Sequence, residues 1–340
     1  MYSSVKTLLA TLCLLWTSSF ATKGEGDKLH FVFELTRHGA RAPGNTAEGY
    51  SVSAGMLTPQ GMRQRYLLGA YNRKRYVEDY QLIDVEQGPE QVVMMSTLVN
   101  RTMVSGYSEL MGMFPPQSKQ SEELSSAQVR AVQSGGAGAP PFKVRDQSQL
   151  NKALGSNPLP EGFTQLPIFN HIEVSMADDL DLTGCDYVNK VDGYRFPAES
   201  TYYSVEWLKD DLREPITEAF DLNKTQSQNM TFMDLYGYCD DVQSNEFEGL
   251  GTGYDYTQDQ LNKINETVLA TLVLPLSDPV LSRNMYVSKM LRLPLTMMTR
   301  FAESNTEGSN IATPKIKFLS YSTHDWTVSQ LLLFLDAENG

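Results

Sequence analysis

Three short apolar-rich runs, far apart in the chain, each lead into charged or polar residues. They cover residues 30–35, 91–96 and 315–321. Runs of this length are typical of strands in a parallel sheet that helices cover on both faces. In open sheets of this kind, ligands bind beyond the carboxyl ends of the strands. The pattern therefore predicts an α/β fold with a functional site where the three strands end.

The first run is followed by R-H-G-A-R-A-P at residues 37–43. Gly39 and Pro43 end the strand and form a tight loop. Arg37 and Arg41 suit an oxyanion with several oxygens, because each guanidinium donates a planar pair of hydrogen bonds. A histidine between them, His38, indicates nucleophilic or acid–base chemistry on that anion.

The other two runs place further candidate residues in the same way. Arg101 lies where the loop after the second run joins a helix that apolar spacing predicts from residue 103 onward. Backbone N–H groups at such a helix start also point at anions. The third run leads into His324 and Asp325 at the start of another predicted helix. Three strand ends thus carry candidate active-site residues, and this recurrence weighs more than any one motif.

The segment at residues 37–43 resembles the signature R-H-G-x-R-x-P of the histidine acid phosphatases. Residues 96–116 resemble the second block of that family, S-T-x-x-x-R-T followed by a helix and F-P-P, and residues 324–325 resemble its H-D motif. The related phosphoglycerate-mutase branch has Asn where this chain has Gly44, so the acid-phosphatase branch fits better. The resemblance covers residues 29–340 and is sharp at these three blocks.

The resemblance implies a three-layer α/β/α domain of the phosphoglycerate-mutase-like type, with a smaller, mainly helical inserted cap domain. We expect a signal peptide at residues 1–21, the catalytic α/β domain at residues 22–133 and 251–340, and the cap at residues 134–250. The flexible S-G-G-A-G-A-P-P segment at residues 134–141 opens the cap. Family members normally continue for several dozen residues past the H-D block, so a fragment and a short protein are both open.

The same resemblance assigns a role to each candidate. His38 would be the nucleophile that attacks phosphorus, and Asp325 would give a proton to the leaving oxygen and then help to activate water. The phosphoryl oxygens would be held by Arg37, Arg41, Arg101 and His324. The substrates would be small phosphate monoesters. No metal ion and no cofactor would be needed, because the arginines supply the positive charge.

Two other functions stay open. One is a metal-dependent phosphohydrolase built on His324 and Asp325, although the chain has only four histidines and lacks an H-E-x-x-H motif. The other is a non-catalytic, anion-binding secreted glycoprotein that keeps the pocket without turnover. The intact His38 and Asp325 argue against this second alternative.

Composition restricts the partners. The formal net charge of −13 argues against nucleic acid and against an anionic membrane surface, so a phosphate site must be a local positive pocket. After the N-terminal leader, no segment reaches the ~18 apolar residues of a membrane-spanning helix, so we expect no stable membrane anchor. Relatives commonly form dimers, which makes a homodimer an open assembly, although the sequence indicates no interface.

The N-terminus indicates entry into the secretory pathway. Lys6, an apolar run at residues 8–16 and S-F-A at residues 19–21 are typical of a cleavable signal peptide. We therefore expect secretion or lysosomal delivery. The two cysteines that remain, Cys185 and Cys239, could pair with each other or with a cysteine beyond the sequence given. Four glycosylation sequons occur, and the last three are plausible acceptors: Asn100, Asn223, Asn229 and Asn265.

Overall fold

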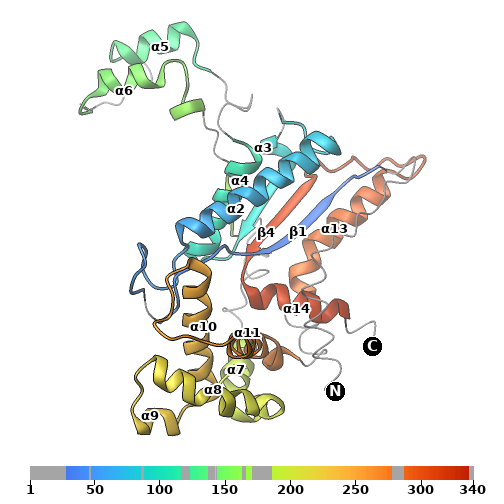
Figure 1. Cartoon of the computed structure of the whole chain (residues 1–340). Coiled ribbons are helices and arrows are strands. Elements are labelled where there is room, and N and C mark those ends of the chain that lie inside the picture. Colours follow the sequence, from blue (N-terminus) through green and yellow to red (C-terminus); the bar gives the residue numbers. More distant parts are fainter. Residues whose placement is uncertain are drawn as a thin grey trace. The chain divides into compact units, whose positions relative to one another are not determined.

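The structure is a computed structural model, shown in Figure 1. It describes residues 28–45, 47–85, 88–115, 123–136, 142, 144–162, 166–170, 186–277 and 287–336. The chain divides into two units, Met1–His30 and Phe31–Gly340, and the second contains all the secondary structure described below. The expected signal peptide and Cys185 lie outside the described residues.

A four-stranded parallel sheet forms the centre of the second unit. Its strands are β1 (Val32–Arg37), β2 (Val92–Ser96), β3 (Ile168–Phe169) and β4 (Phe318–Thr323), in the order β1-β4-β2-β3. The three strands predicted from the apolar runs are confirmed. β1 ends at Arg37 itself, and β4 ends one residue before His324. β2 ends at Ser96, five residues before Arg101.

The register brings the three functional strand ends to one edge of the sheet. Arg37 at the end of β1 lies beside Thr323 at the end of β4, and Ser96 at the end of β2 lies beside Ser322. Because all the strands run in parallel, the loops that follow them leave the sheet on the same side. This arrangement collects residues that are almost 290 positions apart in the chain.

One face of the sheet is covered by α13 (Ser288–Ser304) and α14 (Asp325–Asp336). Alternate side chains of the strands, such as Phe33, Met95 and Tyr321, pack there against Met290 and other apolar residues of these helices. The ring of Phe33 meets that of Tyr321 edge to face, with 5.0 Å between the ring centroids. Apolar burial therefore holds this layer on the sheet.

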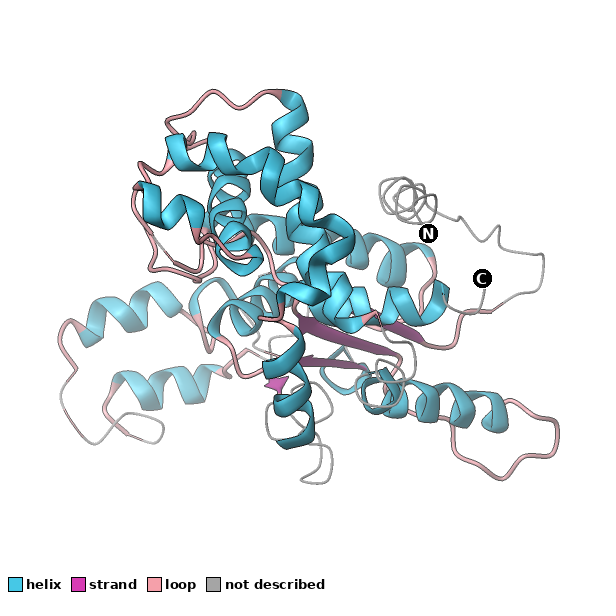
Figure 2. Ribbon diagram, turned by 90° about the horizontal axis from the view of Figure 1, so that it is seen from below, coloured by secondary structure: helices cyan, strands magenta, loops and turns pink. Residues whose placement is uncertain are grey.

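The opposite face carries α2 (Pro59–Asn72) and α4 (Asn100–Met113). The two helices lie in close contact, and a Cβ added at Gly69 or Gly112 would lie about 2 Å from a backbone oxygen of the other helix. Thr58 caps α2, and its side chain accepts a hydrogen bond from the backbone N–H of Gly61. The sheet therefore lies between two helical layers, as Figure 2 also shows.

The remaining elements connect and extend these layers. The helices are α3 (Gly88–Gln91), α5 (Ser126–Gln133), α6 (Gln147–Leu154), α7 (Asp186–Arg195), α8 (Glu206–Ala219), α9 (Lys224–Gln228), α10 (Phe232–Glu248) and α11 (Gln258–Val273). A π-helical segment, η1 (Arg73–Asp79), extends α2, and 3-10 turns occur at η2 (Pro160–Gly162), η5 (Glu199–Val205) and η6 (Leu274–Leu276). Among the described residues, no helix is long and apolar enough to cross a membrane.

Helices α8, α10 and α11 share an apolar core of their own. It contains Leu212 and Ile216 from α8, Leu235 and Cys239 from α10, and Ile264 from α11. Most of this bundle lies in the segment predicted as the cap. Strand β3 lies in the same predicted segment but pairs with β2 at the sheet edge. The division into catalytic domain and cap stays a prediction.

Candidate active site

The loop after β1 buries His38, whose side chain and backbone are only 3% exposed. Its backbone N–H donates to the carbonyl of Thr323 at 2.8 Å, which ties the loop to the end of β4. The ring atom Nδ1 lies 2.8 Å from the carbonyl oxygen of Gly39. Because a carbonyl oxygen only accepts, Nδ1 carries the proton of the neutral ring. The lone pair of the imidazole is therefore on Nε2.

The surroundings keep this imidazole neutral. Burial, together with the positive charges of Arg37 and Arg101, lowers the pKa of His38 to about 2. An ordinary histidine loses its lone pair to a proton below a pH of about 6.5. His38 instead keeps its lone pair in acid, which is what a histidine nucleophile needs.

Two glycines allow the loop to lie against the start of α2. A Cβ at Gly39 would lie 2.3 Å from the carbonyl oxygen of Gly61, and one at Gly61 would lie 2.1 Å from the carbonyl oxygen of Ala40. The N–H of Gly39 donates to the side chain of Ser105 on α4 at 3.0 Å. Both helices of this layer thus hold the histidine loop in place.

Arg101 and His324 converge on the same point from α4 and from the end of β4. A terminal N–H of Arg101 donates to Nδ1 of His324 at 3.4 Å, and Nε2 of His324 lies 3.0 Å from the hydroxyl of Thr97. The rings of His324 and His38 are 5.6 Å apart between centroids. The buried Nε of Arg101 has no hydrogen-bond partner within the described part of the chain. This donor is therefore buried and unsatisfied, whereas the Arg101 side chain as a whole lines the inner cavity.

Asp325 is the first residue of α14 and is bound from two sides. Its Oδ2 accepts from Nε of Arg37 at 3.1 Å, and its Oδ1 accepts from the backbone N–H of Trp326 at 3.0 Å. Burial alone raises the pKa of the Asp325 carboxyl, but Arg37 and His38 outweigh it and hold the pKa below its usual value. The carboxylate is therefore ionised when the pocket is empty.

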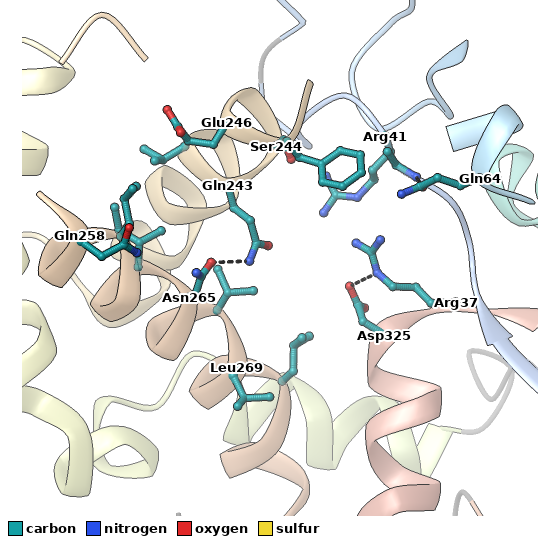
Figure 3. A pocket seen from close by; sticks show the side chains of 17 residues that line it. Arg37, Arg41, Gln64, Gln243, Ser244, Glu246, Gln258, Asn265, Leu269 and Asp325 are labelled. Carbon is teal, nitrogen blue, oxygen red and sulfur yellow. Dashed lines mark hydrogen bonds and ion pairs between the residues drawn. The ribbon is translucent and has the colours of Figure 1, made fainter. Parts of the chain in front are cut away.

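Five of the six predicted residues line one cavity of about 300 Å³: His38, Arg41, Arg101, His324 and Asp325. The sixth, Arg37, lines an adjoining cavity of about 690 Å³. Arg41 and Asp325 line both cavities. In Figure 3, Arg37 and Asp325 lie together at one end of the larger cavity, next to Arg41. We call the smaller one the inner cavity and the larger one the outer cavity.

Arg41 has a partner that the sequence did not indicate. Its two terminal nitrogens donate to the two carboxylate oxygens of Asp240 on α10, at 2.8 and 3.0 Å. Burial lowers the pKa of Arg41, but the charge of Asp240 outweighs it, so the pKa lies above its usual value. Arg41 is charged, and Asp240 compensates that charge.

Tyr236 lies one helical turn before Asp240 and also lines the inner cavity. Burial, aided by the charges of Asp240 and Asp325, raises the pKa of Tyr236 to about 12. Its phenol is therefore a neutral donor beside the anion site. Nothing in the sequence connects α10 with the histidine loop, which lies about 200 positions earlier.

The structure describes the cysteines, the glycosylation sequons and the potential metal ligands only in part. Cys239 is buried in α10 as a free thiol, while Cys185 lies outside the described residues, so their pairing stays a prediction. The asparagines of all four sequons are exposed. Asn223 also caps α9 with its side chain, and Asn265 lies on the wall of the outer cavity. Glycosylation stays a prediction. No group of three or more potential metal ligands occurs among the described residues.

Comparison with known proteins identifies the family. The model of the histidine phosphatase superfamily, branch 2, matches residues 46–340. The chain belongs to this superfamily. The membership confirms the resemblance drawn from the three blocks, the first of which lies just before the matched range.

Curated relatives agree with this membership. A lysosomal acid phosphatase of Xenopus laevis is 23% identical over 98% of this chain and 67% of its own length. Shorter matches include a putative acid phosphatase, F26C11.1, of Caenorhabditis elegans, 38% identical over 29% of this chain and 24% of its own length. The mouse prostatic acid phosphatase is 34% identical over 32% of this chain and 28% of its own length. The matched segments thus span about a quarter of the length of these last two relatives.

Solved structures show the same fold. The phytase of Hafnia alvei in complex with myo-inositol hexakis sulphate aligns with a TM-score of 0.53 and 17% identity, covering 89% of this chain and 74% of the phytase chain. A Klebsiella phytase aligns with a TM-score of 0.52 and 13% identity, covering 91% of this chain and 73% of the phytase chain. These alignments and the layers described above confirm the predicted α/β fold.

Proposed function

We propose that this protein is an acid phosphatase that hydrolyses phosphate monoesters through a phosphohistidine intermediate, without a metal ion. The observation that carries the proposal is the state of His38. Its imidazole is buried and neutral, with Nδ1 bound to a carbonyl and Nε2 left with a lone pair. Arg101, His324 and Asp325 line the same inner cavity.

The first step transfers the phosphoryl group to His38. The lone pair of Nε2 attacks phosphorus, the P–N bond forms, and the bond between phosphorus and the ester oxygen breaks. Negative charge spreads over the three other oxygens of the group. Arg101, which lines the inner cavity, and Arg37 are the donors that would stabilise this charge.

Asp325 supplies the proton for the leaving oxygen in this step. In the empty pocket its carboxylate is ionised and paired with Arg37. A phosphate group that draws Arg37 toward itself adds negative charge next to Asp325 and so raises the pKa of that carboxyl. At acid pH the carboxyl can then hold a proton and give it to the alcohol as that group departs.

The second step returns His38 to its starting state. Asp325, now ionised, accepts a proton from a water molecule, and the water oxygen attacks phosphorus. The P–N bond breaks, the electron pair returns to Nε2, and inorganic phosphate leaves. The backbone carbonyl of Gly39 keeps the proton on Nδ1 throughout, which presents the same nitrogen in every cycle.

An assay with p-nitrophenyl phosphate at a pH of about 5 tests this proposal against the two alternatives. Turnover that withstands a chelator supports it. Turnover that stops with the chelator supports a metal-dependent phosphohydrolase, and no turnover supports a non-catalytic anion-binding protein. His38→Ala is expected to abolish turnover, because the nucleophile is absent.

The intermediate can be tested directly. Rapid acid-free quenching with labelled substrate is expected to trap label on His38 as an acid-labile, base-stable phosphoramidate. The yield is expected to increase in Asp325→Asn, because water attack is slowed once the general base is missing. Label on another residue, or none in either protein while turnover is intact, would contradict the phosphohistidine route.

We also propose that the protein enters the secretory pathway and is secreted or delivered to lysosomes. The leader-like pattern at residues 1–21 supports this, and relatives of this chain include a lysosomal acid phosphatase. Expression in a secreting eukaryotic cell is expected to yield a mature chain that begins near Thr22. N-terminal sequencing of the product that finds Met1 would contradict it.

A further inference from the structure

The outer cavity adjoins the position where the leaving group of a substrate would lie. Its volume of about 690 Å³ is within the range of small-molecule sites. Asp325, the proposed proton donor, lines both the inner and the outer cavity. A phosphoryl group at His38 whose ester oxygen faces Asp325 therefore directs its alcohol into the outer cavity.

Charge is scarce on the described lining of this cavity. The charged side chains are Arg37, Arg41, Glu246 and Asp325. Arg37 pairs with Asp325 and Arg41 pairs with Asp240, so both cations already have acidic partners. Both lie at the end of the cavity where Asp325 and the phosphoryl group would be (Figure 3). Figure 3 shows Glu246 away from this end, beyond Gln243. A second phosphate on the alcohol would meet this carboxylate and no further cation from the described lining.

One wall of the cavity is apolar and belongs to α11. It consists of side chains along one face of the helix: Leu261, Ile264, Val268, Leu269 and Leu272. Neutral polar groups face this wall, among them Gln64, Ser244 and the Gln243 amide that donates to Asn265 at 2.8 Å. An alcohol with an apolar body can pack on the helix while its polar groups reach the amides.

We infer that the outer cavity selects monophosphate esters whose alcohol is uncharged and carries an apolar body, such as an aryl or long alkyl group. This inference rests on the proposed function and names its substrate class. It sets the chain apart from a polyphosphate-binding protein, even though its fold is that of a phytase crystallised with an inositol hexakis sulphate.

The first experiment compares kcat/KM for 2-naphthyl phosphate, glycerol 2-phosphate and myo-inositol hexakisphosphate at a pH of about 5. The naphthyl ester is expected to exceed each of the other two by about tenfold, because only its ring covers the apolar wall. Equal or faster turnover of the hexakisphosphate would overturn the inference while leaving the proposed function intact.

If no ester is turned over, the proposed function is contradicted but the selectivity of the outer cavity is not. A binding measurement tests the selectivity in that case. Titration calorimetry of the wild-type protein with 2-naphthyl sulfate and with myo-inositol hexakissulfate uses analogues that a phosphatase does not hydrolyse. Tighter binding of the naphthyl compound is expected. Tighter binding of the hexakissulfate would overturn the inference.

Two substitutions locate the selectivity. Leu269→Gln, which makes the wall polar, is expected to lower kcat/KM for the naphthyl ester about fivefold relative to glycerol 2-phosphate. Glu246→Lys is expected to raise the ratio of hexakisphosphate to naphthyl ester turnover about threefold. Glu303→Lys makes the same charge change on α13, outside the cavity lining, and is the matched control. Equal ratios in the two lysine variants would show that net charge acts and the cavity does not.

Discussion

Asp240 decides how much positive charge the residues after β1 offer to a phosphate. It holds Arg41 through two hydrogen bonds, and the side chains of both residues are 11% exposed. A buried carboxylate in this position offsets one of the three arginine charges around the anion site. The pocket is therefore less cationic than its three arginines alone indicate.

Asp240→Asn is expected to strengthen inhibition by inorganic phosphate about tenfold, because Arg41 loses its counter-charge but keeps an amide partner of the same size. The free energy of unfolding is expected to fall by about 3 kcal/mol, since one partner of a buried ion pair is removed. Competitive inhibition at a pH of about 5 and urea unfolding measure the two effects. Asp210→Asn, at an exposed ion pair on α8, is the control, and an unchanged inhibition constant in Asp240→Asn would contradict this role.

The loss of kcat/KM in Asp325→Asn is expected to depend on the leaving group of the ester. An alkyl ester needs a proton on its departing oxygen, so its kcat/KM is expected to fall by about 10² or more. The p-nitrophenolate of p-nitrophenyl phosphate departs with little assistance, so its first step is expected to lose less. The measurement compares kcat/KM for the two esters in the variant and in the wild type. Equal losses for both would indicate that Asp325 only positions Arg37.

The side chains named from the motifs lie around the cavities, whereas the residues that α10 contributes belong to none of these motifs. The six predicted side chains gather around two adjoining cavities, since each lies at or beyond the end of a strand and these strands end at the same sheet edge. Tyr236 and Asp240 reach the site from a helix that touches the histidine loop only in the folded chain. Their sequence neighbourhood carries no strand-end pattern, so no local signal could have indicated them.

The close approach of α2 and α4 holds the two elements that position the anion-binding groups. Gly112→Ala places a Cβ about 2 Å from the carbonyl oxygen of Tyr66 and must push the helices apart. The free energy of unfolding is expected to fall by about 2–3 kcal/mol, and kcat/KM is expected to fall as well, because α4 carries Arg101 near its start. Urea unfolding and the p-nitrophenyl phosphate assay measure these effects.

Gly193→Ala is the matched control for this substitution. Gly193 also lies within a helix, α7, but a Cβ there has open space. Its unfolding free energy is expected to rise by about 0.5–1 kcal/mol, because alanine favours the helix. Equal effects of the two substitutions would indicate that helix propensity acts and the contact between α2 and α4 does not.

The elements that the sequence indicated are those with a strong local pattern. The apolar runs of β1, β2 and β4 and the Thr58 cap of α2 all have one. Strand β3 has only two residues and gains its stability from pairing with β2, so propensity alone could not reveal it. Helix α10 did carry a signal, a capping box from Thr231 to Asp234, in a segment that otherwise has weak periodicity.

The stability of the whole molecule is expected to depend on pH through His38. Its pKa is about 2 in the folded protein and about 6.5 when unfolded, so the unfolded chain binds more protons between these values. Stability is therefore complete above a pH of about 6.5 and falls as the pH decreases through this window. Burial is the largest cause of the shift, followed by the charge of Arg37, so the effect needs the folded pocket.

The variant His38→Gln is expected not to lose stability through this titration when the pH falls, because it has no imidazole at this position. Between pH 6.5 and 5.0, as chosen assay conditions, the wild type is expected to lose about 1.5 kcal/mol of unfolding free energy relative to the variant. Urea unfolding at the two pH values measures the difference. Parallel profiles for the two proteins would mean that the imidazole titrates normally in the folded state.

The place of β4 in the sheet has a consequence for how the protein is made. β4 separates β1 from β2, yet a ribosome produces it some 220 residues after β2. Until then β1 and β2 have no shared partner and present open edges, which invite pairing with other chains. Parallel pairing over such a separation is also slow. Newly made chains are therefore expected to depend on chaperones until the central strand inserts, and the inner cavity can form only after that step.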